Sequence, residues 1–158
     1  MDKRNLIAAF PKLQDDEVFL NSKMSPETPD YNCIAWAYML YEDKWMWPPG
    51  GVPHLDGVTY WPNGIGKTAA IENLVDAFAN IGYEECGQSW QHEEGFIKVA
   101  LYYNPTNMEF THAARESRSG NYWMSKLGQS YDICHKTPYT IENNVYGKVY
   151  CIMKRSGK

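Results

Sequence analysis

The fold is decided by residues 95–126, GFIKVALYYNPTNMEFTHAARESRSGNYWMSK. The run 95–103 is rich in aromatic and β-branched residues, a composition typical of a strand. A turn containing a proline and two asparagines separates it from a second predicted strand, 108–115. The letters SGN then predict a hairpin that leads to a return strand, 122–126. Three consecutive strands joined by short turns predict an antiparallel meander.

The remaining predicted elements lie on both sides of this meander. Asp30 or Asn32 is placed to cap a buried apolar helix, and Gly82 is placed to end a second helix. In chain order these elements are a short strand at 18–20, helices at 33–40 and 68–81, and strands at 131–134 and 145–153. Because the helices come first and the strands afterwards, the order predicts an α+β protein.

The chain length predicts a single domain, 1–158, in which residues 1–24 form a lead-in segment. Residues 43–66 hold four prolines and five glycines, which preclude a regular element. Three tryptophans and a tyrosine in the same stretch indicate a packed loop and one wall of a cleft.

Composition limits the partners and the compartment. The formal net charge is -4, so nothing argues for a nucleic-acid or anionic-membrane partner. The four cysteines form no CxxC pair, and no histidine cluster has a recognised metal spacing, so we expect no metal and no cofactor. The apolar run Leu6 to Phe10 is too short for a signal peptide. We therefore expect reduced cysteines in a cytoplasmic protein, with export as an effector still open.

Cys33 is the first candidate for chemistry. It lies in the first turn of the predicted helix at 33–40, where unpaired N–H groups favour a thiolate and can stabilise an oxyanion. A buried structural cysteine is the competing interpretation, because free cysteine is often buried.

A cysteine nucleophile needs an imidazole near it in space. His112 lies on the second predicted strand between apolar residues, where a neutral ring can accept the thiol proton. A third group should orient that ring. Asp132 and His135 are the candidates, with Gln129 as a further one. If Asp132 and His135 share a strand, they point to opposite faces, so only one of them can be the orienting residue.

The order of these residues resembles that of papain-like enzymes. The segment from Asn32 to Ala37 looks like the nucleophile segment of the CHAP amidohydrolases and their NlpC-type relatives, and KVALY with THAAR looks like their two central strands. The chain is more closely similar to an uncharacterised bacterial family of single papain-like domains. The shared features are YNCIAWA, Trp45 and Trp47, Tyr60-Trp61-Pro62, KVALY, THAAR, Trp123 with Ser125-Lys126-Leu127-Gly128, DIxH and YGKV, within about 25–155.

The resemblance implies a fold in which N-terminal helices pack on a C-terminal antiparallel meander or half-barrel. It also implies an oxyanion donor close to Cys33. Glu27 stands where papain has a glutamine and cannot donate when ionised, so Tyr31, Asn32 and the Cys33 N–H are the candidates. We expect Trp36, Trp61 and Ser125 to line the substrate cleft.

The implied function is a cysteine hydrolase or transferase that acts on an amide bond, as a peptidase, amidase or deamidase. The substrate would be a peptide, a peptidoglycan stem or a glutamine side chain, and a bacterial effector or toxin is one possible setting. The alternatives are an inactive papain-like module that binds a protein partner and an immunity-type partner of a toxin. Exposed tryptophan and tyrosine side chains in the irregular loop favour the binding module.

Overall fold

The computed structural model describes residues 3–26, 32–38, 45–48, 59–127 and 131–157. Within these ranges the chain forms a seven-stranded sheet of order β1-β8-β7-β6-β5-β9-β4, with all neighbours antiparallel. Its strands are β1 (Ser25–Pro26), β4 (Glu84–Glu85), β5 (Phe96–Asn104), β6 (Glu109–Glu116), β7 (Trp123–Lys126), β8 (Tyr131–His135) and β9 (Lys148–Ser156). A separate parallel pair joins β2 (Trp45–Met46) to β3 (Thr59–Tyr60).

The helices are short and lie mainly before the sheet. They are α1 (Lys3–Ala9), η1 (Pro11–Asp15), α2 (Glu17–Asn21), α3 (Cys33–Ala37), α4 (Ile71–Ala79) and η2 (Pro138–Ile141). Among the described residues, none of the helices is long and apolar enough to cross a membrane. The protein is therefore α+β with an antiparallel sheet, as the order of predicted elements indicates.

The predicted meander is confirmed, since β5, β6, β7 and β8 pair in sequence order. The closing strand does not extend it. Instead, β9 returns to the far edge of β5, where it pairs along most of that strand. This return places β5 inside the sheet, between β6 and β9, where it is buried on both faces and Ala100, Leu101 and Tyr102 are fully covered.

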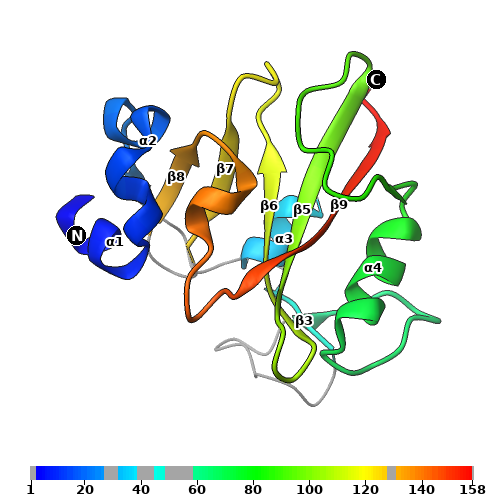
Figure 1. Ribbon diagram of the computed structural model, residues 1–158. Coiled ribbons are helices and arrows are strands. Elements are labelled where there is room, and N and C mark those ends of the chain that lie inside the picture. Colours follow the sequence, from blue (N-terminus) through cyan, green and yellow to red (C-terminus); the bar gives the residue numbers. More distant parts are fainter. Residues whose placement is uncertain (1–2, 27–31, 39–44, 49–58, 128–130, 158) are drawn as a thin grey trace.

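Each face of the sheet has its own apolar core. Helices α3 and α4 cover one face, where Ala113 and Leu101 pack with Cys33 and Phe78. Segments α1, η1, α2 and η2 cover the other face, where Tyr102 and Ala114 belong to the core. Figure 1 shows α1 and α2 at the β8 side of the sheet and α4 near β9. The antiparallel layout thus separates successive residues of β6 between two different cores.

The strand predicted at 18–20 is wrong, because these residues lie in α2. Asp16 caps this helix by accepting a hydrogen bond from Phe19 N at 3.0 Å, and such a cap favours a helix over an extended run. The segment 1–24 is also more than a lead-in. Leu13 and Phe19 are fully buried in the second core, so the segment supplies one cover of the sheet.

Asp16 joins this cover to the sheet, which gives a stability prediction. Its second carboxylate oxygen accepts a hydrogen bond from Lys136 N, just after β8, at 2.8 Å. Asp16→Ala removes both bonds and leaves buried N–H groups without a partner, so we expect a loss of about 2 kcal/mol in the free energy of unfolding. Asp15→Ala is the matched control, because Asp15 is adjacent and exposed. Urea denaturation of both variants tests this, and equal midpoints would contradict the anchoring role.

Candidate active site

Asn32 fixes the position of Cys33. The Asn32 side chain caps α3 by accepting from Ala35 N at 3.0 Å. The same oxygen accepts from Met46 N at 3.0 Å, and its amide nitrogen donates to Met46 O at 3.0 Å. Asn32 is therefore a buried clamp between the start of α3 and β2. One of its two amide N–H donors is engaged by the backbone carbonyl of Met46, which leaves one donor for the oxyanion role considered from the sequence.

The Cys33 thiol is buried against β6, with 8% of the residue exposed. Burial raises the pKa of the thiol to about 11. Hydrogen bonds from the backbone N–H groups of Ala113, Ile34 and Cys33 itself and the charge of Lys126 act against that rise in pKa. The expectation of a thiolate favoured by a helix start is thus not met at rest. Helix α3 has only five residues, and desolvation of the thiol outweighs the amides that face it.

His112 lies on β6 next to Ala113, and its ring is fully buried. It stacks on the Tyr146 ring with a centroid separation of 4.2 Å and an interplanar angle of 7°. The Tyr102 ring lies 5.1 Å away on the neighbouring strand. Burial, and after it the nearby His135, holds the pKa of His112 well below its usual value. The imidazole is consequently neutral at physiological pH.

Three side chains form a hydrogen-bonded chain across β6, β7 and β8. His112 Nε2 lies 3.2 Å from Ser125 Oγ, and Ser125 Oγ lies 2.8 Å from His135 Nε2. The chain ends on the backbone, because His135 Nδ1 lies 2.8 Å from Thr137 O. All three side chains are fully buried. Strand pairing aligns Ser125 with Ile133, which places Ser125 and His135 on one face of the sheet.

The end of this chain assigns both tautomers. A carbonyl only accepts, so His135 Nδ1 carries a proton and donates to Thr137 O. His135 Nε2 is then an acceptor, and the Ser125 hydroxyl donates to it. The Ser125 oxygen in turn accepts from His112 Nε2–H. This leaves the Nδ1 lone pair of His112 without a hydrogen-bond partner among the described residues, buried and able to accept a proton.

Cys33 and His112 approach β6 from opposite faces. Cys33 packs with Ala113 in the α3 core, whereas His112 packs with Tyr102 and Tyr146 in the other core. Strand β6 pairs with β7 only through Arg115 and Glu116, so no further ladder joins the two strands beside His112. Burial first, and after it the charge of an ionised Cys33, raises the pKa of the Tyr146 hydroxyl. No hydrogen bond joins Cys33 Sγ to His112 Nδ1 in this structure.

The structure distributes the other predicted residues unevenly. Asp132 pairs in register with Lys126 and lies on the face opposite Ser125 and His135, as strand alternation requires. Trp36 is buried under Arg115, and Trp61 stacks on Phe110 at 5.8 Å. Of the candidates for the third residue, His135 is the one joined to His112, through Ser125. Tyr31, Glu27 and Gln129 lie outside the described residues.

Three residues of the site were not singled out from the sequence. Tyr146 stacks on His112, Thr137 O anchors His135, and Lys126 places its charge near the Cys33 thiol. Tyr146 lies in the closing YGKV segment, and its aromatic side chain was the signal in the sequence that could have indicated a stacking partner for His112. A backbone carbonyl such as that of Thr137 gives no signal in a sequence.

The buried His135 predicts a pH dependence of stability. Burial lowers the pKa of His135 to about 4, against about 6.5 when unfolded. Below pH 6.5 the unfolded chain takes up a proton that the folded chain refuses, so stability falls as the pH falls toward 4. We expect His135 alone to remove about 2 kcal/mol between pH 7 and pH 5.

Urea denaturation at several pH values tests this in the wild type and in His135→Gln, whose amide oxygen can still accept from Ser125. The variant should lose less stability than the wild type between pH 7 and pH 5. Parallel pH profiles would show that His135 is protonated as easily in the folded protein as in the unfolded chain.

Comparison with known proteins adds a family but no activity. No curated protein and no solved structure matches the chain. The family described as a domain of unknown function, DUF7689, matches residues 22–154, which include Cys33, His112, Ser125 and His135. The match begins after α2, which ends at Asn21. Because it spans most of the sequence, the chain belongs to the DUF7689 family.

Proposed function

We propose that the protein is a papain-like cysteine hydrolase or transferase that acts on an amide bond, with Cys33 as nucleophile and His112 as base. One observation carries the proposal. The hydrogen-bonded chain through Ser125 and His135 holds the proton of His112 on Nε2, where it is donated to Ser125, and leaves the Nδ1 lone pair available. His112 is one residue from Ala113, whose N–H faces the Cys33 thiol. A neutral imidazole held in one tautomer, with a free ring nitrogen one residue along β6 from the N–H that faces the thiol, supplies the base that general-base activation requires.

Under this proposal Cys33 and His112, the catalytic dyad, are both uncharged before substrate binds. The raised pKa of Cys33 and the lowered pKa of His112 keep the proton on sulfur rather than on the ring. Proton transfer therefore accompanies attack: Sγ bonds to the carbonyl carbon while Nδ1 takes the thiol proton. Substrate binding must bring Sγ and Nδ1 into hydrogen-bond reach, which is common in enzymes whose catalytic contacts tighten only in the complex.

The remaining steps use groups already at the site. The N–H groups of Cys33 and Ile34 face the thiol and can stabilise the oxyanion. When the carbon–nitrogen bond breaks, His112 returns its proton to the leaving amine and a thioester remains on Cys33. Water, or an acceptor amine in a transferase, then attacks the thioester. His112 takes the proton of that nucleophile and passes it to the departing thiol.

His135 and Ser125 act as positioning residues in this scheme. They touch the base rather than the substrate, and they fix which nitrogen of His112 carries its proton. An amide in a peptide, a peptidoglycan stem or a glutamine side chain would suit the nucleophile. We propose a cytoplasmic setting, or one reached by export as an effector.

A second candidate function is an inactive papain-like module that binds a protein partner. The burial of Cys33 favours this function, because an exposure of 8% and a pKa raised to about 11 are also typical of a structural cysteine. The experiment below separates the two functions.

The sharpest test is acyl transfer from p-nitrophenyl acetate, with the modified cysteine identified by mass spectrometry. We expect an acetyl adduct on Cys33 and a drop of about 100-fold or more in its formation in His112→Gln, because general-base catalysis is worth at least that factor. The rate should stay level from pH 8 to 6.5, since the pKa of His112 lies below this range. An exposed thiol would lose reactivity about tenfold per pH unit.

The chain supplies its own controls. Cys86 is a partly exposed cysteine away from Cys33, and His92→Gln removes an imidazole outside the site. The hydrolase proposal fails if Cys33 is acetylated no faster than Cys86 and His112→Gln changes nothing. That result would leave the binding module as the function the structure favours.

A further inference from the structure

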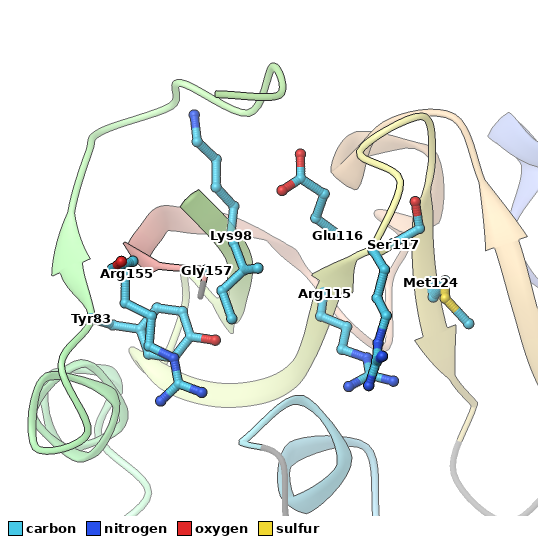
Figure 2. A pocket seen from close by; sticks show the side chains of 11 residues that line it. Tyr83, Lys98, Arg115, Glu116, Ser117, Met124, Arg155 and Gly157 are labelled. Atoms are coloured by element: carbon cyan, nitrogen blue, oxygen red, sulfur yellow. The ribbon is translucent and has the colours of Figure 1, made fainter. Parts of the chain in front are cut away.

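An acidic chain concentrates arginine in one cavity. The formal net charge is -4, yet a cavity of about 630 Å³ holds three arginines and a lysine against one glutamate. Its lining is Tyr83, Ile97, Lys98, Arg115, Glu116, Ser117, Arg118, Met124, Arg155, Ser156 and Gly157 (Figure 2). Tyr83 lies just before β4, and the other residues come from β5, β6, β7 and β9 and from the segments next to them.

The lysine and the glutamate are engaged elsewhere. Lys98 Nζ donates to Ser89 O at 2.7 Å and to Gln91 O at 2.8 Å. The carboxylate oxygen Oε2 of Glu116 lies 3.1 Å from His92 Nδ1, within hydrogen-bond distance. Figure 2 shows Lys98 and Glu116 pointing away from the guanidinium groups of Arg115 and Arg155. The charge that faces the cavity on the α3 side is therefore that of arginine.

Two of the arginines are held in fixed positions by aromatic rings. The Arg115 guanidinium lies over the Trp36 ring, 4.0 Å from its centroid. The Arg155 guanidinium lies over the Tyr83 ring at 4.9 Å and donates to Ile81 O at 3.0 Å. A guanidinium has five N–H donors, so one carbonyl contact and a stacked ring leave Arg155 with donors to share. Side chains ordered in advance lose less entropy when a ligand binds.

Strand pairing sets the distance between these two arginines. Arg115 pairs with Val99 of β5, and Val99 pairs with Met153 of β9, two residues from Arg155. Two strand spacings and a two-residue offset put their Cα atoms about 12 Å apart. Ile97 lies between them on β5 as an apolar floor. Two long side chains at this separation can converge on one anionic group.

The cavity also lies beside the thiol. Ala113, whose N–H faces Cys33, precedes Arg115 by two residues on the same face of β6, about 7 Å away. Trp36, under Arg115, follows Cys33 by three residues on α3, which places them on the same side of that helix. A molecule that reaches from the cavity to Cys33 therefore passes over Trp36.

From this placement we infer that the cavity binds an anionic oxygen group, a carboxylate or a phosphate, of a ligand whose other end reaches Cys33. Its role as a substrate subsite rests on the proposed hydrolase function; anion binding itself does not. The substrate class it implies is an amide with an acidic group several bonds from the scissile carbonyl. Bidentate pairing of guanidinium with carboxylate or phosphate supplies the recognition.

The test uses the full chain carrying Cys33→Ala, so that binding is measured without chemistry. Glutarate and inorganic phosphate are titrated separately by isothermal calorimetry, with glutaramide as the neutral counterpart of glutarate. We expect at least one anion to bind, and glutaramide not to bind. Arg118→Gln and Arg155→Lys should each weaken that binding about tenfold or more. The first substitution removes a positive charge, and the second keeps the charge but removes the planar guanidinium that binds an anion through two parallel N–H donors. Arg118 is exposed, so its replacement leaves the core intact.

Lys136→Gln is the matched control, because it removes an exposed positive charge on another part of the surface. Equal loss in Lys136→Gln, or binding of glutaramide as tight as that of glutarate, would overturn the inference, as would the absence of anion binding. Anion binding without acetylation of Cys33 would uphold this inference and reject the hydrolase. Acetylation of Cys33 without anion binding would do the reverse.

Discussion

The hydrogen-bonded chain from His112 through Ser125 to His135 is the constraint on which the site depends. It crosses three strands inside a core, where a polar atom without a partner costs about 1–3 kcal/mol. Each link therefore needs the next, and the last needs the carbonyl of Thr137. Strands β6 and β7 pair through Arg115 and Glu116, and beyond this ladder the side-chain bond from His112 to Ser125 ties the two strands together. The same bonds that satisfy the core set the proton on His112.

Burial then decides what kind of dyad this can be. A histidine and a cysteine in water exchange a proton easily, but here desolvation moves their pKa values apart, with the thiol raised and the imidazole lowered. Both directions disfavour an ion pair at rest. Under the proposed function, the chemistry compatible with these directions is concerted deprotonation, for which the fixed tautomer of His112 matters more than the charge of Cys33. Lys126 and the backbone N–H groups near the thiol would then supply electrostatic assistance.

Much of the fold could be predicted because it depends on local signals. The run 95–103 and the hairpin at Gly120, whose φ is +78°, mark β5 and the β6–β7 turn, and strand alternation correctly set Asp132 and His135 on opposite faces. The segment 18–20 misled because its apolar run fits a strand as well as a helix, and Asp16 decides the matter through its cap. The position of β9 beside β5 is a long-range pairing, which no local pattern specifies.

The members of the candidate site could be proposed from the sequence, but the hydrogen bonds that connect them could not. Cys33, His112 and His135 were candidates by residue type, whereas Ser125 was expected only to line the cleft. Its place between two imidazoles depends on the register of β7 against β8. The raised pKa of Cys33 could not be predicted either, since the first-turn position of Cys33 suggests a thiolate and only the packed structure shows that desolvation outweighs the amides.

Alternation along β6 assigns a separate task to each side of the strand. His112 faces the core under α1 and α2, where buried polar partners hold its ring in place. Ala113 and Arg115 face α3, where the thiol and the cavity lie. A base on one face cannot be displaced by an anionic ligand bound on the other, so positioning of the ring and recognition of charge remain independent. Under the proposed function, contact between Cys33 and His112 would therefore form around the edge of β6, beyond its pairing with β7, and a substrate carbonyl would lie at that edge.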